Sequence, residues 1–163
     1  ARAEMLTVSQ MHELDLGSVL HQAVDQVYSL AQGKALKLVR ELPDEPLWIN
    51  GDFTLLERAA INFLQNAVTH SPAGGSITIG TTRVAGEIRF WVDNEGRPLP
   101  EKTVARLFQR LSRGDAARAG QDSTGLGLYF VRLVAEKHGG TVGVDCSRIG
   151  KVRFWASVAP LEE

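Results

Sequence analysis

Two glycines at the start of a predicted helix are the first candidates for chemistry. Gly125 and Gly127 are spaced i, i+2, and apolar residues then repeat at helical spacing up to Gly139 and Gly140. A backbone without Cβ atoms lets a ligand approach closely, and the first N–H groups of a helix point outward with the positive end of its dipole. This arrangement favours phosphate binding. A tight turn before a core helix would have the same sequence, because neither G-x-x-x-x-G-K-[ST] nor G-x-G-x-x-G after a strand is present.

Two asparagines on another predicted helix are the next candidates. Asn62 and Asn66 lie four residues apart, so their carboxamides share one face of a helix over residues 53–70, and His70 follows one turn later. Considered alone, the pair is an exposed polar stripe on a surface helix. Its interpretation therefore depends on the elements around it.

The composition is ordinary for a globular domain. Of the 163 residues, 44% are hydrophobic and 23% are charged, and the formal net charge of −1 predicts no general affinity for nucleic acid or membranes. Cys146 is the single cysteine, so an intramolecular disulfide is excluded. No apolar run approaches the roughly 20 residues of a membrane span. Because the chain begins at Ala1 rather than at methionine, we expect a fragment of a longer protein.

Hydrophobic periodicity divides the chain into helices and strands. Helices are predicted over residues 17–32, 53–70 and about 101–111, with a fourth inside 122–140. Strands are predicted over residues 13–16, 36–42, 47–50, 77–79, 88–92, 141–145 and 152–158. The first helix is expected to bury Val19, Leu20, Ala23, Val24, Val27, Leu30 and Ala31, and the second Leu56, Ala60, Phe63, Leu64 and Ala67. Residues 93–100 and 112–124 are expected to be loops, the second of them mobile.

These elements predict an α+β fold, a two-layer sandwich. Neighbouring strands near the C-terminus suggest antiparallel hairpins, and the helices need one face of a sheet on which to bury their apolar stripes. We expect a mixed, mostly antiparallel sheet of about five or six strands, covered by about three or four helices.

The order of the motifs resembles that of a known family. Ile61-Asn62-Phe63-Leu64-Gln65-Asn66-Ala67 resembles an N box, Leu107-Phe108-Gln109-Arg110-Leu111 an F box, and Ser123-Thr124-Gly125-Leu126-Gly127-Leu128 a second glycine box. Together they resemble the ATP-binding catalytic domain of sensor histidine kinases, which has the Bergerat-type fold shared with gyrase. The resemblance covers about residues 14–160, and the combination in this order is far more specific than any one motif.

The resemblance implies roles for the residues of the N box. Asn66 would be the ligand of Mg²⁺, for which a side-chain carbonyl is a suitable hard oxygen donor. Asn62 stands where ATPase relatives have a general-base Glu, and because Asn cannot act as a base, phosphoryl transfer to a protein histidine is favoured over hydrolysis. His70 stands near the phosphates in relatives, but a helix-end residue stabilised by the dipole is an equal alternative. Thr69 replaces a common Lys.

The first glycine box departs from the family pattern D-x-G-x-G. Alignment places Asn94 at the Asp that accepts a hydrogen bond from the adenine amino group, Gly96 at the first Gly and Pro98 at the second. Asp93 is the alternative one residue earlier, and in an extended segment it faces the other way. A neutral acceptor in place of a charged one predicts a loss of roughly 1 kcal/mol, and therefore weakened ATP binding.

The loop over residues 112–124 would be the ATP lid of the family. Arg113 and Arg118 could reach phosphates from it, although a solvated charge is the more common fate of a loop Arg. Phe108 either packs under the lid or fills the core. The remaining nucleotide-binding positions implied by the resemblance are Thr124, Gly125, Leu126, Gly127 and Leu128.

The sequence therefore predicts a histidine kinase catalytic domain that binds ATP and Mg²⁺ and presents the γ-phosphate to a histidine elsewhere. Residues 1–12 would be the tail of a preceding dimerisation and phosphoacceptor region or a linker, and residues 13–163 the catalytic domain. His12 lacks the pattern of an acceptor helix, so the acceptor is expected on the separate dimerisation domain of the same kinase. A response regulator would act downstream in this two-component signal transduction system.

The resemblance also implies a cytoplasmic location, without nucleic acid or direct membrane contact. One alternative is a degenerate module of the same fold with weak or no ATP binding. Another is a relative of the serine-kinase anti-sigma factors.

Overall fold

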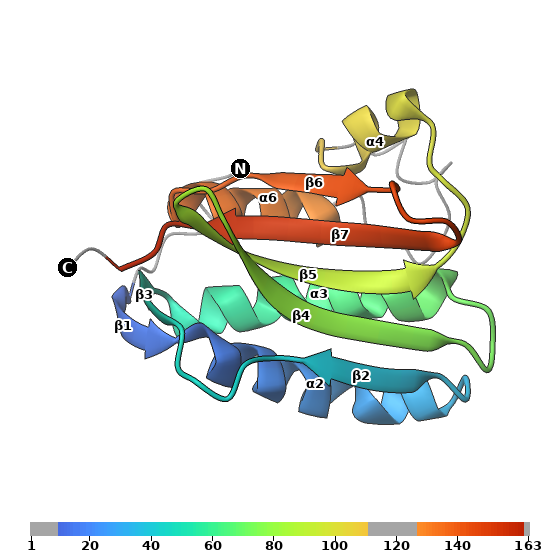
Figure 1. Cartoon of the computed structure of the whole chain (residues 1–163), viewed down its shortest axis with the longest axis horizontal. Helices are drawn as coiled ribbons and strands as arrows, with labels where there is room; N and C mark the ends of the chain where they lie inside the picture. The colour runs from blue at the N-terminus through green and yellow to red at the C-terminus, as the bar shows by residue number, and fades with distance from the viewer. Residues whose placement is uncertain (1–9, 111–126, 162–163) are drawn as a thin grey trace.

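The computed structural model describes residues 10–110 and 127–161. In chain order its elements are β1 (His12–Asp15), α2 (Leu16–Gln32), β2 (Lys37–Glu41), β3 (Trp48–Gly51), α3 (Phe53–His70), β4 (Ser76–Val84), β5 (Glu87–Glu95), α4 (Glu101–Leu107), α6 (Gly127–Lys137), β6 (Val142–Asp145) and β7 (Lys151–Val158) (Figure 1). Within these two ranges no helix has the length and apolar character needed to cross a membrane.

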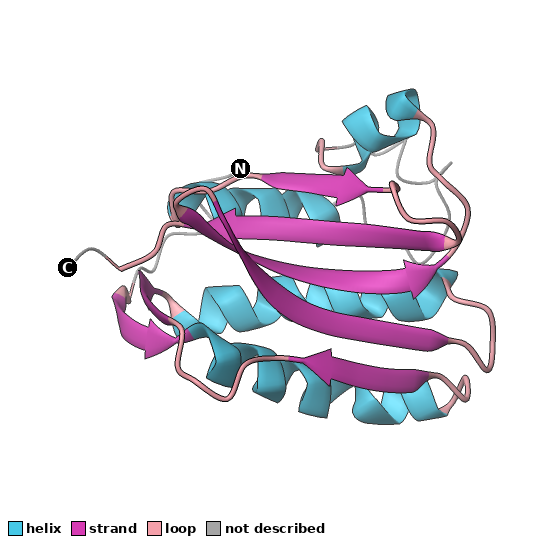
Figure 2. Cartoon of the chain, viewed as in Figure 1, coloured by secondary structure: helices cyan, strands magenta, loops and turns pink. Residues whose placement is uncertain are grey.

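Five strands form the main sheet, in the order β2-β4-β5-β7-β6, while β1 and β3 form a separate antiparallel pair. β2 is parallel to β4, and the other neighbours are antiparallel. Helices α2, α3 and α6 cover one face of the sheet, which we call the inner face (Figures 1 and 2). The opposite, outer face carries no helix of the described residues. The predicted α+β two-layer sandwich with a mixed, mostly antiparallel sheet is confirmed.

Side-chain caps and buried stripes explain where α2 and α3 form. Asp15 accepts a hydrogen bond from the Gly17 N–H at 3.0 Å, and Asp52 accepts one from the Leu55 N–H at 3.1 Å. Every residue predicted to be buried on α3 lies in the core, namely Leu56, Ala60, Phe63, Leu64 and Ala67. The caps therefore fix the starts of two helices whose apolar stripes lie against the inner face.

The prediction that Leu30 of α2 is buried is wrong, because its side chain is 51% exposed. After Val27, the next buried residue of α2 is Ala31, four residues later. Leu30 lies about 100° before Ala31 around the helix axis, and this rotation turns it towards solvent.

The hairpin of β4 and β5 is longer than the sequence predicts. Its strands have nine residues each and are joined by Ala85 and Gly86 alone, which both have positive φ, at 42° and 85°. The predicted loop over residues 93–100 is wrong at its start, because residues 93–95 continue β5 and pair with β7. Asp93 disfavours a strand on propensity, but two arginines neutralise it here.

α4 ends earlier than predicted. The helix stops at Leu107, and residues 108–110 form a turn instead of continuing to residue 111. Phe108 has φ −99° and ψ 5°, and its buried ring lies 6.4 Å from that of Phe154. We attribute the early end to the burial of this ring. The predicted loop over residues 112–124 lies outside the described residues.

The C-terminal end of α6 is joined to the start of α3. Gly139 has φ 78°, the left-handed conformation of a glycine that ends a helix. His138 is 5% exposed, donates from Nδ1 to the Val134 carbonyl at 2.7 Å, and accepts at Nε2 from the Asp52 N–H at 3.0 Å. Burial lowers the pKa of His138 below its usual 6.5, and nearby Lys137 acts in the same direction, while the Val134 hydrogen bond and Asp52 oppose them. The neutral ring therefore links two helices.

Two tryptophans cover part of the outer face. Trp91 of β5 is 4% exposed and lies over Gly80 of β4, where an added Cβ would be 2.4 Å from Cζ2 of the indole. Trp155 of β7 lies over Gly143 of β6, and the corresponding distance is 2.5 Å. The two rings therefore require glycine on the neighbouring strand.

Candidate functional site

The C-terminal ends of α3 and β5 and the N-terminal end of α6 lie at the same end of the molecule, on the right in Figure 1. The chain order explains this. Asn94 near the end of β5 pairs with Ile77 at the start of β4, which follows α3 directly. α3 also packs against α6. These three elements carry most of the described residues that the sequence singles out.

A side-chain hydrogen bond joins two of the predicted motifs. Asn62 on α3 donates from Nδ2 to the carbonyl of Gly127 at 3.1 Å, across 65 residues of sequence. Gly127 is exposed and begins α6 in the described chain. The polar face of α3 is thereby placed beside the first turn of α6, the helix expected to bind phosphate.

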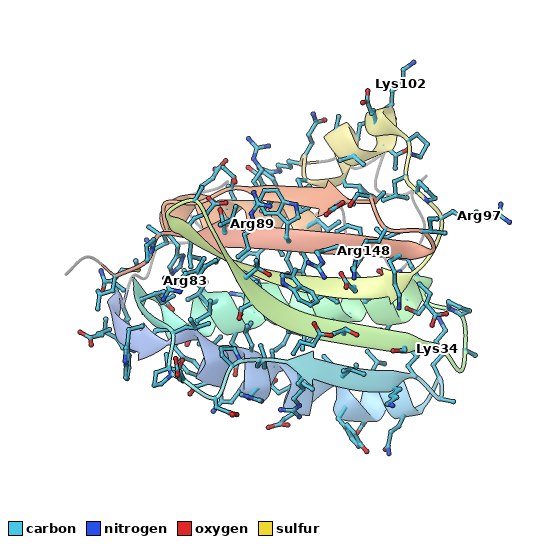
Figure 3. All side chains as sticks on the ribbon, in the orientation of Figure 1. Lys34, Arg83, Arg89, Arg97, Lys102 and Arg148 are labelled. Carbon is cyan, nitrogen blue, oxygen red and sulfur yellow. The ribbon has the colours of Figure 1, made fainter. Side chains whose placement is uncertain are left out.

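The last turn of α3 carries two further predicted residues. Asn66 is half-buried, and among the described residues its carboxamide has no hydrogen-bond partner. His70 ends the helix and is exposed. Lys34, labelled in Figure 3, donates to the carbonyls of Val68 at 2.8 Å and Thr69 at 3.1 Å, and so neutralises the negative end of the helix dipole. The exposure of His70 is compatible with both of its interpretations.

Asp93 and Asn94 lie on opposite faces of β5. Asp93 is on the outer face, where its carboxylate is bound by Arg153 at 2.7 and 3.0 Å and by Arg148. Asn94 is on the inner face and 5% exposed, and it donates from Nδ2 to the Glu95 carbonyl at 3.1 Å. Its Oδ1 is buried and has no partner within the described part of the chain. A buried acceptor without a donor is rare, and a donor group of a ligand is one kind of partner that would satisfy it.

Gly96 is held against the turn between β6 and β7. Its N–H donates to the Gly150 carbonyl at 3.0 Å. An added Cβ would lie 3.3 Å from Cγ2 of Val152 and 3.7 Å from Nδ2 of Asn94. A larger residue would therefore press on Val152, while Asn94 would stay at an ordinary van der Waals distance. Pro98, at the position of the second glycine in the family pattern, is exposed.

The other predicted residues are distributed between the core and the part of the chain that is not described. Phe108 is 7% exposed and contacts Phe154, which matches the core alternative for its role. Leu128 is half-buried at the start of α6. The residues that lie outside the described ranges are Arg113, Arg118, Thr124, Gly125 and Leu126. His12 opens β1 and pairs with Gly51.

The donors and acceptors at this end of the molecule match those that a nucleotide and Mg²⁺ require. Mg²⁺ takes hard oxygen ligands and retains waters and substrate phosphates, so one protein carboxamide is sufficient. Asn66 provides such an oxygen. In residues 10–110 and 127–161 there is no group of three His, Cys, Asp or Glu residues that could hold a metal by itself. The Oδ1 atom of Asn94 is an acceptor suited to an amino group.

A surface hollow of about 620 Å³ lies apart from these residues. It is lined by Tyr28, Gln32, Ala35, Leu36, Lys37 and Leu38, from the end of α2 to β2. No residue singled out from the sequence lines it, so we do not assign the site to it.

The sequence assigns no role to Arg153, which the structure places on Asp93. The sequence signal that could have indicated this contact is the alternation of side chains along the two strands. Asp93 and Trp91 share one face of β5, and Arg153 and Trp155 share one face of β7, so opposite charges and aromatic rings recur with a period of two. The Asn62–Gly127 hydrogen bond has no such signal, because it depends on how α3 packs against α6.

The fold and the arrangement of this site define a class of ATP-binding domains. The family of histidine kinase-, DNA gyrase B- and HSP90-like ATPases matches residues 51–163, and the chain belongs to this family. Within it, the similarity is to sensor histidine kinases, which confirms the resemblance of the motifs. The catalytic domain of histidine kinase ThkA superposes with a TM-score of 0.81 at 24% identity, over 93% of this chain and 97% of that one, and shares its fold.

Curated relatives are sensor proteins of bacteria. The probable sensor kinase SilS of Salmonella typhimurium is 33% identical over 152 residues, which are 91% of this chain and 30% of SilS. The sensor protein CzcS of Cupriavidus metallidurans is 34% identical over 156 residues, 94% of this chain and 32% of CzcS. The sensor protein IrlS of Burkholderia pseudomallei is 39% identical over 108 residues, 66% of this chain and 23% of IrlS. The chain thus spans a third or less of the length of these relatives.

Proposed function

We propose that this chain binds ATP with Mg²⁺ and presents the γ-phosphate to a histidine on a separate domain of a sensor kinase. The observation that carries the proposal is the buried, unpartnered Oδ1 of Asn94 at the same end of the molecule as the Asn62–Gly127 contact. An acceptor at this position suits the amino group of adenine. The first turn of α6, beside Asn62, suits the phosphates at the other end of the nucleotide.

The residues of the site would act by positioning the nucleotide and by stabilising its charge. Asn66 would hold Mg²⁺ through its carboxamide oxygen, and the metal would supply neutralisation of phosphate charge. Asn62 donates to a backbone carbonyl and has no basic group, so it would orient the start of α6 rather than activate water. Phosphoryl transfer requires mainly alignment and electrostatic stabilisation, which such a site can provide without a general base of its own.

The partners in this proposal are an acceptor histidine on the dimerisation domain of the same kinase and a response regulator. A solved structure of histidine kinase ThkA contains the response regulator protein TrrA, and a chain of that structure superposes with a TM-score of 0.77, over 94% of this chain and 42% of that one. Names of relatives as sensor kinases support a role in signalling. We place the domain in the cytoplasm, where ATP is available, with no direct contact to nucleic acid or the membrane.

Calorimetric titration tests the proposal. ATP and a non-hydrolysable analogue would be titrated with and without Mg²⁺, with GTP alongside. We expect Mg²⁺-dependent binding in the micromolar to low millimolar range with a preference for ATP. Absence of heat and of chemical-shift changes at millimolar ATP would contradict it.

Asn66→Ala and Asn66→Asp would identify the metal ligand. We expect both to abolish Mg²⁺-dependent ATP binding while the fold is retained in circular dichroism. Gln65→Ala is the matched control, because Gln65 is an exposed neighbour on the same helix. Unchanged ATP affinity in the Asn66 variants would remove this residue from the site.

Asn94→Asp tests the nucleobase contact. A charged acceptor should tighten ATP several-fold, by about 1 kcal/mol. The same change removes the hydrogen bond to the Glu95 carbonyl, so the free protein should lose stability. If Asp93→Ala weakens ATP binding and Asn94→Ala does not, Asp93 is the residue that contacts the base.

A degenerate module that acts through protein contacts is the second candidate. This second function is favoured by three positions at which the resembled family has another residue, namely Asn94, Pro98 and Thr69. Absence of binding heat in every nucleotide titration would favour this second function.

A further inference from the structure

The outer face of the sheet carries a charged cluster directly behind Asn94. Arg153 of β7 lies over the indole of Trp91, 3.6 Å from the ring centroid, and binds both carboxylate oxygens of Asp93. Arg148, in the turn before β7, binds Oδ2 of the same carboxylate and is labelled in Figure 3. Trp91 in turn is fixed by its indole N–H, which donates to Oγ1 of Thr82 at 2.9 Å. The cluster therefore joins three strands.

Burial makes these contacts obligatory for Asp93. Its side chain is 7% exposed, and a carboxylate with so little solvent needs charged partners. The two bonds from Arg153 are a bidentate pair, the arrangement with the strongest geometric preference. The position of the Asp93 backbone is thus coupled to the position of Arg153 on the neighbouring strand.

The same backbone determines where the Asn94 carboxamide points. Asp93 and Asn94 are consecutive in β5, and their side chains project from opposite faces. Within the described residues, the one hydrogen bond of the Asn94 side chain goes to the carbonyl of the next residue, Glu95. If this stretch of β5 shifts, the Glu95 carbonyl shifts with it. The carboxamide of Asn94 then loses the hydrogen bond that holds Nδ2 and leaves Oδ1 as the atom without a partner.

We propose that Asp93, bound by Arg153 and Arg148, is a positioning residue that holds Asn94 as a hydrogen-bond acceptor for the nucleobase. The inference rests on the nucleotide site proposed above. A carboxamide that turns by 180° presents a donor in place of an acceptor. Adenine offers an amino donor where guanine offers a carbonyl acceptor. The cluster on the outer face therefore sets the preference for ATP over GTP from the opposite side of the sheet.

The far end of the same strand pair provides a matched control. Arg89 of β5 lies over the indole of Trp155, 3.8 Å from the centroid, and binds Glu87 at 2.9 Å. Its exposed fraction, 31%, is close to the 23% of Arg153. Figure 3 shows Arg89 away from the end where β5 meets the candidate site. Arg89→Gln removes a comparable stack and ion pair without reaching Asn94.

The first measurement uses the free protein. The side-chain amide signals of Asn94, assigned by their loss in Asn94→Asp, would be recorded by nitrogen-15 NMR for the wild type, Arg153→Gln and Arg89→Gln. We expect one narrow pair in the wild type and in Arg89→Gln, and shifted or exchange-broadened signals in Arg153→Gln. The same signals in all three proteins would overturn the proposal, whether or not nucleotide binds.

The second measurement is the ratio of ATP to GTP affinity. We expect Arg153→Gln to lower it by about three- to tenfold, the effect of one misdirected neutral hydrogen bond, and Arg89→Gln to leave it unchanged. An equal loss of ATP and GTP affinity in both variants would show a merely structural cluster. If Arg153→Gln does not fold, Arg148→Gln, at a side chain that is 50% exposed, takes its place with a smaller expected change. A wild type that binds neither nucleotide refutes the proposed function, and the NMR result then decides the positioning alone.

Discussion

The two faces of the main sheet are covered by different kinds of side chain. The inner face uses aliphatic and aromatic side chains against α2, α3 and α6, with Phe63 at its centre near Phe90 and Phe154. The outer face lacks a helix in the described chain and instead uses two tryptophans with an arginine over each. A charged and aromatic sequence pattern on one face of a strand can therefore bury single side chains such as Trp91 and Asp93 while its arginines stay half-buried.

The largest expected effect is on the inner face. Phe63→Ala removes a ring that is 1% exposed and lies 5.9 Å from Phe90 and 6.2 Å from Phe154. We expect a loss of about 3–5 kcal/mol in the free energy of unfolding, measured by urea denaturation. A loss below that of Trp155→Ala on the outer face would reverse the ranking of the two faces.

Gly143→Ala tests how tightly Trp155 packs on the outer face. The new Cβ would lie 2.5 Å from Cζ2 of Trp155, and the three nearest atoms all belong to that indole. We expect a loss of about 1–3 kcal/mol. In a Trp155→Leu background the same substitution should become close to neutral. A neutral Gly143→Ala in the wild-type background would show that the indole can move away.

His138 allows the helical layer to be weakened by pH. Its pKa is lowered in the folded protein, so the unfolded chain binds more protons between the folded pKa and the usual 6.5. The contribution of His138 is therefore complete above pH 6.5 and is lost as pH falls through the folded pKa. We expect urea midpoints to decrease from pH 7.5 to 5. The decrease should be smaller in His138→Gln, and an identical profile in that variant would exclude His138 as its source.

The smallest expected effect concerns the turn that joins the two longest strands. Ala85 has φ 42° and precedes Gly86, so both central residues of the turn are left-handed. Asn tolerates this conformation better than Ala, and we expect Ala85→Asn to stabilise the protein by about 0.5–1 kcal/mol. Thermal denaturation would measure the gain, with Thr81→Asn in the middle of β4 as a control that should destabilise.

The helices and their buried faces could be predicted because their apolar residues repeat with the period of a helix. Asn62 and Asn66 follow from the same periodicity, and the order of the boxes indicates the family. The end of β5 could not be predicted in this way. Asp93, Asn94 and Glu95 have the propensities of a loop, and they extend a strand where neighbouring strands pair with them and distant arginines neutralise Asp93. Likewise, the free Oδ1 of Asn94 follows from a single hydrogen bond to a backbone carbonyl.

The short turn at Ala85 and Gly86 also has a consequence for the order in which the molecule assembles. β4 and β5 close a loop of two residues, whereas β5 and β7 are separated by residues 96–150, all of which belong to the loop that closes when these strands pair. Loop closure of the first kind is fast, and that of the second kind is slow. We expect the β4–β5 hairpin to be formed in the folding transition state, so that Ala85→Asn accelerates folding and leaves the unfolding rate nearly unchanged. The contacts completed last would then be those between β5 and β7, among them the stacks of Arg153 on Trp91 and of Arg89 on Trp155.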